Sequence, residues 1–182
     1  MLELRIDEAN DRQPQLARVS KTLVRVYINH REEERESTEG DEKHTVYIAD
    51  FVEVESASSD ALEVAKQAVS DAILAYDSSP AVNEFTLQGV PMWLDKATRS
   101  GLKLRLEAEQ ETGKESTTLW YGAKAVTLPV TTAMVMLNRL EIYASECYDV
   151  TQGHLAHVAM LNSVEEVLGY NIEAGYPEKL NF

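Results

Sequence analysis

The sequence predicts an α+β protein, because two kinds of apolar periodicity occupy different parts of the chain. In residues 22–29 and 45–55, branched and aromatic residues alternate with polar ones, which is typical of strands with one buried face. In the second half, apolar residues recur every three or four positions, as they do on one face of an amphipathic helix. We therefore expect an N-terminal antiparallel β-sheet with one helix, followed by a module that combines a β-hairpin with a helical bundle.

The N-terminal sheet is expected to contain the strands 22–29 and 45–55. A third strand is expected near the N-terminus, where Leu2, Leu4 and Ile6 alternate with polar residues. The segment 31–44 carries ten charged residues, and we expect a mobile, solvated connection because such a block cannot be buried at reasonable cost. Its acids do not follow the order of a calcium loop, which needs Asp or Asn at alternating positions and a distal Glu.

A helix is expected at residues 60–76, where Asp60 supplies the N-cap and the apolar residues have helical spacing. The polar run from Asp77 to Pro80, with two serines between them, ends this helix. We expect a boundary between two modules there. Residues 1–79 then form a β-rich N-terminal module, and residues 80–182 form a second module.

The first half of the second module is expected to contain two strand pairs separated by a helix. Residues 84–93 are expected to turn near Gly89, and Asp95 can cap a helix that ends before Gly113. Residues 119–121 and 125–128 are expected to pair around a glycine-bearing turn.

The second half of this module is expected to be helical. An apolar stripe predicts a helix over 130–148; its members are Ala133, Leu137, Leu140, Ala144 and Cys147. We expect a turn at Asp149-Val150 and a separate helix over 151–161, with Leu155, Val158 and Ala159 facing inward. The capping box that starts at Ser163 predicts a short helix that Gly169 terminates.

The charge of the chain narrows the choice of partners. Its 182 residues include 31 acidic and 17 basic ones, for a formal charge of −14. Such a chain is repelled by phosphate backbones and anionic lipids, so we expect neither nucleic acid nor a membrane as partner. With no apolar signal core and no apolar run of about 20 residues, we expect a protein that is cytoplasmic when synthesised.

No group of residues predicts catalysis or a bound cofactor. Cys147, His154 and His157 have ligand chemistry, but no fourth ligand is evident, so we expect no tightly held metal. Cys147 could act as a nucleophile, but it closes an apolar stripe, where a free cysteine is usually a small hydrophobic residue. The serines lack a nucleophile-elbow setting and the glycines form no phosphate loop. We therefore predict no catalytic residue, no cofactor and no enzymatic activity.

Several motifs from Phe85 onward occur in a characteristic order. They are F-x-L-x-G-V-P-x-W-L-D at 85–95, Thr98-Arg99, T-L-W-Y-G and T-L-P at 118–129, Y-A-S-E-C-Y at 143–148, Thr151, His154, S-V-E-E-V at 163–167 and G-Y-P-E-K-L at 175–180. Residues 85–182 thereby resemble a domain of unknown function found in tailed-phage and prophage proteins, often as the C-terminal module of tail-fibre or other tail-associated chains. The hairpin turn is Asp-Asn in many members of that family, whereas this chain has Gly122-Ala123-Lys124.

The resemblance implies a structural or accessory role in a phage, with protein partners such as tail components, self-association into a homo-oligomer, and a place in the virion. It supplies no catalytic residues. The alternative is an acidic, prophage-encoded protein that binds or inhibits a host protein.

Protein contacts need aromatic and aliphatic anchors in a charge-poor patch. Two segments qualify, 89–93 and 119–128, which makes Trp93, Trp120 and Tyr121 the candidate contact residues. For Trp120 a position in the core is the preferred interpretation, and an aromatic contact with another chain or a receptor is the alternative.

Overall fold

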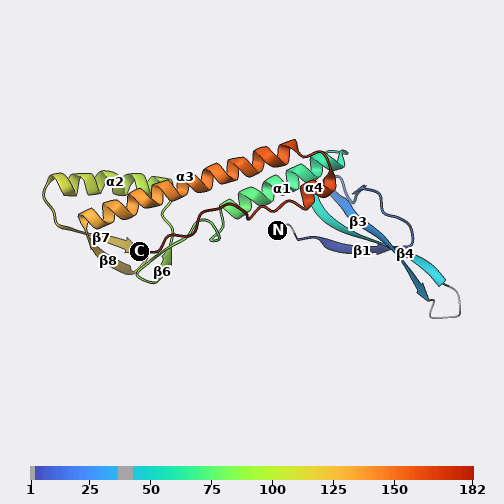
Figure 1. Ribbon diagram of the computed structural model, residues 1–182, viewed down its shortest axis with the longest axis horizontal. Coiled ribbons are helices and arrows are strands. Elements are labelled where there is room, and N and C mark those ends of the chain that lie inside the picture. The colour runs from blue at the N-terminus through green and yellow to red at the C-terminus, as the bar shows by residue number, and fades with distance from the viewer. Residues whose placement is uncertain (1–2, 37–42) are drawn as a thin grey trace. The chain divides into compact units, whose positions relative to one another are not determined.

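Four antiparallel strands form the N-terminal sheet of the computed structural model, which describes residues 3–36 and 43–182 (Figure 1). The strand order is β1-β4-β3-β2, with β1 at Arg5–Ala9, β2 at Leu16–Arg18, β3 at Leu23–Glu36 and β4 at Lys43–Glu55. The fold is α+β as the sequence indicates, and the strands predicted at 22–29 and 45–55 are present in β3 and β4. The strand expected near the N-terminus is β1, but it begins only at Arg5 and Ile6 is 63% exposed, so the expected apolar alternation is not its basis; Leu2 lies outside the described residues. The short edge strand β2 was not predicted, because three residues are too few to show an alternating pattern.

The strands β3 and β4 continue as a two-stranded ribbon through much of the charged segment. After an irregularity between Ile28 and Arg31, the residues from Arg31 to Glu36 pair with those from Ile48 back to Lys43. The prediction that 31–44 is a connection is therefore wrong for 31–36 and 43–44, while 37–42 lie outside the described residues. The charges are compatible with strand structure because residues 31–36 are all exposed.

Helix α1 (Ala61–Asp77) agrees with the helix predicted at 60–76. The Oδ1 atom of Asp60 accepts a hydrogen bond from the backbone N–H of Leu62 at 2.9 Å, which confirms the predicted cap.

The next three elements follow their local signals. Strands β5 (Phe85–Leu87) and β6 (Val90–Met92) turn at Gln88 and Gly89, which both have positive φ. Helix α2 (Lys96–Glu111) begins after Asp95, whose side chain accepts from the Thr98 N–H at 2.7 Å.

The second hairpin and the last helix also form where the sequence predicts them. Strands β7 (Ser116–Tyr121) and β8 (Lys124–Pro129) enclose a turn in which Gly122 has φ of 58°. Helix α4 (Val164–Leu168) has Ser163 as its N-cap, as the capping box predicts.

Helix α3 runs without a break over Val130–Met160, so the predicted turn at Asp149-Val150 is wrong. The hydroxyl of Thr151 bonds to the carbonyl oxygen of Cys147 (3.0 Å) and to Oδ1 of Asp77 (2.8 Å). A residue of low helix propensity is thus held in the helix by a contact with a residue far away in the sequence. Of the residues expected inward after the turn, Val158 is buried and Leu155 half-buried, but Ala159 is exposed.

The contacts within the chain group it into two compact units. The sheet unit contains residues 1–75 and 153–174, and the hairpin unit contains residues 76–152 and 175–182. Helix α3 contributes residues to both. The division into modules 1–79 and 80–182 stays a prediction.

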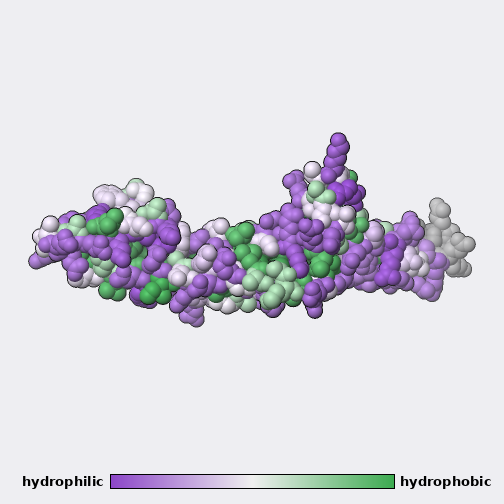
Figure 2. Space-filling model, turned by 90° about the horizontal axis from the view of Figure 1, so that it is seen from above, coloured by the Kyte–Doolittle hydropathy of each residue, from purple (hydrophilic) through white to green (hydrophobic). Residues whose placement is uncertain are grey.

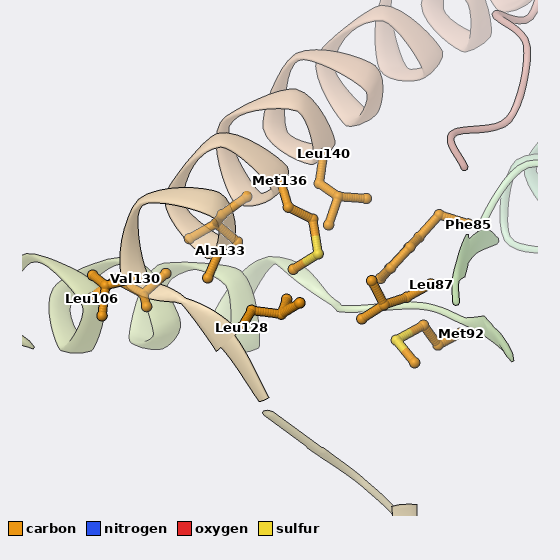
Figure 3. Packing of buried hydrophobic residues seen from close by; sticks show 10 residues of the cluster. Phe85, Leu87, Met92, Leu106, Leu128, Val130, Ala133, Met136 and Leu140 are labelled. Carbon is orange, nitrogen blue, oxygen red and sulfur yellow. The ribbon is translucent and has the colours of Figure 1, made fainter. Parts of the chain in front are cut away.

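The hairpin unit has its own apolar core, built on the first turns of α3 (Figure 3). Side chains of Ala133, Met136 and Leu140 point toward Leu128 of β8 and toward the β5–β6 hairpin. The predicted stripe is buried at four of its five positions, and Ala144 is half-buried. Tyr143, which the stripe did not include, is also buried, and its hydroxyl donates to the Val82 carbonyl at 2.8 Å.

Hydrophilic residues cover most of the face drawn in Figure 2, where hydrophobic residues appear in separate groups. Within the described residues, no helix has the length and apolar character required to cross a lipid bilayer.

Replacing Leu137 or Leu140 by Ala should lower the free energy of unfolding by about 2–5 kcal/mol, because each deletion leaves a cavity in this core. The measurement is the denaturant midpoint, with Ile142→Ala as control, since Ile142 lies on the same helix and is 61% exposed. Midpoints that change no more in the two leucine variants than in the control would contradict the placement of α3.

Candidate functional site

An apolar groove of about 220 Å³ lies in the hairpin unit. Both hairpins, α2 and Met136 of α3 contribute to it, and most of its lining is aliphatic: Leu87, Val90, Met92, Leu94, Leu102, Leu119, Val126 and Met136. The other lining residues are Thr98, Arg105, Trp120, Tyr121 and Lys124. No Asp or Glu lines the groove, although the chain contains 31 of them.

The hairpin β7–β8 forms one wall of the groove. Its register places Leu119 opposite Val126 and Tyr121 opposite Lys124. Because side chains alternate along a strand, these four share the face that also carries the buried Thr117 and Leu128. Trp120 belongs to the other face, yet it borders the groove.

A polar anchor holds this wall against α2. The Arg105 guanidinium donates to the Thr117 hydroxyl at 2.7 Å and to the Thr118 carbonyl at 3.1 Å. Its Nε donates to Oε1 of Glu109 at 3.0 Å, and the Lys114 ammonium donates to the same oxygen at 2.6 Å. The hydrogen bond from Lys114, helped by Arg105 and Thr117, lowers the pKa of Glu109 from its ordinary value of 4.5 to about 2.

The two cations of the groove differ in what they already bind. Arg105 is committed to Thr117, Thr118 and Glu109. Lys124 is exposed at the start of β8, and no residue in the described part of the chain pairs with its ammonium group. Lys124 is therefore the cation of the groove that is available to an external acceptor.

The three predicted contact residues have different environments. Trp120 is 71% exposed and Tyr121 is 46% exposed, so the preferred interpretation of Trp120 as a core residue is wrong. Trp93 is half-buried and does not line the groove. Its ring lies 6.3 Å from that of Tyr143 and 5.5 Å from the guanidinium carbon of Arg99.

The predicted contact segment 119–128 contains the groove residues Leu119 and Val126 without singling them out, and sequence reasoning missed Arg105. The matched alternation on the two strands of the β7–β8 hairpin was a usable signal for the first two, because it defines a shared apolar face. Nothing in the sequence pointed to Arg105, whose role depends on the contact between α2 and β7.

The residues considered for metal binding or catalysis are engaged in packing and hydrogen bonds. Cys147 is buried beside Val82 and Tyr143, and this burial raises the pKa of its thiol. The ring nitrogens of His154 lie 2.7 Å from the Tyr170 hydroxyl and 2.8 Å from the Ala174 carbonyl. Among the described residues, no three or more His, Cys, Asp or Glu side chains are grouped to hold a metal ion.

Comparisons of this chain with protein-family models, with curated proteins and with solved structures each found no match. The assignment to a phage domain family therefore stays a prediction.

The ion pairs of Glu109 with Lys114 and Arg105 predict a pH-dependent effect of the change Glu109→Gln on stability. The folded pKa of Glu109 is below its ordinary value, so its contribution to stability is present above pH 4.5 and is lost as the pH falls toward about 2. The variant should have a lower denaturant midpoint than the wild type at pH 7, and the difference should vanish near pH 2. The exposed Glu107 of the same helix gives the control, Glu107→Gln. An equal midpoint difference at both pH values would disprove the role of this carboxylate.

The environments of the two tryptophans predict opposite effects of truncation. Trp93→Ala should destabilise the protein by about 2–4 kcal/mol, somewhat less than a fully buried tryptophan, since Trp93 is half-buried. Trp120→Ala should change the free energy of unfolding by no more than about 0.5 kcal/mol, as most surface substitutions do. Chemical denaturation of both variants measures this, and a large loss for Trp120→Ala would mean that the hairpin is packed differently.

Proposed function

We propose that this protein is a non-enzymatic structural or accessory protein of a phage or prophage, associated with the tail, and that it acts through protein–protein contacts at the groove of the hairpin unit. The observation that carries the contact proposal is an apolar groove without acids, bordered by exposed Trp120 and Tyr121, on a chain of charge −14. The phage assignment is supported by the order of the motifs in residues 85–182.

The chemistry of the groove favours a protein partner. Interface cores are depleted of charge, and Trp and Tyr are enriched among the residues that contribute most to binding energy. Sites for small molecules and cofactors usually have volumes of about 300–1,000 Å³. At about 220 Å³ the groove is smaller, and its size is better matched to side chains that a partner inserts.

A second candidate function is host-directed binding or inhibition by an acidic surface. It is favoured by the exposed end of β3, where Glu32, Glu33, Glu34 and Glu36 outnumber Arg31 and Arg35. This function would use the charged ribbon of the sheet unit, whereas the first uses the groove.

The two candidates can be separated by capture from cells in which the phage that encodes the chain has been induced. Val126→Asp places a charge in the groove, and Val135→Asp places the same charge on α3 outside it, where Val135 is 59% exposed. We expect wild type and Val135→Asp to capture tail components identified by mass spectrometry, and Val126→Asp to lose about 90% of that capture.

Equal capture of tail components by both variants would contradict a contact at the groove. Capture of host proteins alone, unaffected by Val126→Asp, would favour the inhibitor function. Circular dichroism of both variants controls for folding.

A further inference from the structure

The size of the groove limits what can enter it. A cavity of about 150 Å³ is large enough to bind one benzene molecule. The groove, at about 220 Å³, has room for one large apolar side chain, or for two small ones, and is too small for an extended apolar surface. The groove can therefore hold one apolar side chain of a peptide segment, while the rest of the segment lies outside it.

The charge at its edge specifies what accompanies the apolar side chain. The charged groups that line the groove are both cationic, and Arg105 is already bonded to Glu109 and to the β7 strand. The Lys124 ammonium lies at the rim with no partner in the described chain, opposite the half-exposed Tyr121. A carboxylate at the rim would give Lys124 a charge-assisted hydrogen bond.

We propose that the groove binds a peptide segment of a partner protein in which one large apolar residue, Leu or Phe, stands next to an Asp or Glu. The apolar side chain fills the groove between the two hairpins, and the acidic neighbour pairs with Lys124. This inference rests on the proposed function, since it specifies the partner segment of the same site.

Net charge distinguishes this occupant from a second copy of the chain. A second copy carries a formal charge of −14, whereas a short segment carries one or two carboxylates. The screening length is about 8 Å at physiological salt, so a carboxylate at the rim interacts mainly with Lys124 and little with distant acids. The repulsion that opposes self-association is therefore much weaker for a peptide.

The test uses labelled nine-residue peptides on a Gly-Ser background, each with a central Leu or Phe beside an Asp or Glu. Matched peptides carry Lys in place of the acid or Ala in place of the apolar residue. Fluorescence anisotropy gives the dissociation constants for the whole protein. Because an exposed ion pair contributes up to about 1 kcal/mol, we expect the acidic peptide to bind about fivefold tighter than its Lys counterpart. The Ala peptides should not bind measurably.

Charge reversal gives the decisive comparison. Lys124→Glu should invert the preference, so that the Lys peptide binds better than the acidic one. Lys103→Glu changes the net charge equally but lies on α2 outside the groove, and it should leave the preference intact. Raising the salt to about 1 M should remove the preference and leave the contribution of the apolar residue.

Three results would overturn the inference. The first is the same peptide preference in the Lys124→Glu variant and the wild type. The second is no measurable binding of any of the peptides, and binding of dodecanoate that Val126→Asp abolishes would then indicate a fatty-acid site instead. The third is self-association in sedimentation that Val126→Asp abolishes. If the acid preference is absent but Val126→Asp still loses tail components, the contact at the groove stands and the specified segment is wrong.

Discussion

The buried face of α3 is the constraint on which the hairpin unit depends. Between Val130 and Leu140 this face meets α2 and both hairpins, and Leu140 has no exposed surface. Met136 belongs to the same core and also lines the groove. The shape of the candidate binding surface is therefore continuous with the packing that stabilises the unit. A change of volume in this part of the helix alters the core and the groove together, because protein interiors are close-packed.

The wall of the groove needs support from outside the hairpin. A two-stranded hairpin is marginally stable in water by itself, and β7–β8 has no third strand among the described residues. Support comes from the buried Leu128 and from Arg105, which connects Thr117 to Glu109. The burial of Leu128 holds the hairpin against the core, and the directional hydrogen bonds of Arg105 fix the position of β7 relative to α2. An exposed pair such as Trp120 and Tyr121 can then be presented in a defined orientation.

Much of the fold was predictable because its determinants are local. The N-caps at Asp95 and Ser163 and the turn at Gly89 each depend on residues within a few positions, and all three formed where expected. The continuity of α3 was not predictable, since the hydroxyl of Thr151 is held by Asp77. The groove was least predictable, because its lining is assembled from elements that only the tertiary structure brings together. The exposed charges from Arg31 onward resembled a loop in the sequence. Strand pairing uses backbone groups, so the polarity of the side chains does not reveal it.

The charged ribbon of the sheet unit also affects how the molecule avoids other copies of itself. Strand β2 pairs only with residues 24–26 of β3, so among the described strands the outer edge of β3 is open from Arg31 to Glu36. An open edge is a template for non-native pairing and aggregation. Here a strand that approached the edge would have to place its backbone beside closely spaced charges of both signs. The charges of Arg35, Glu8 and Glu33 are already held in ion pairs with one another. The block of charge that resembles a loop in the sequence thus opposes the pairing of other chains with the open edge of β3.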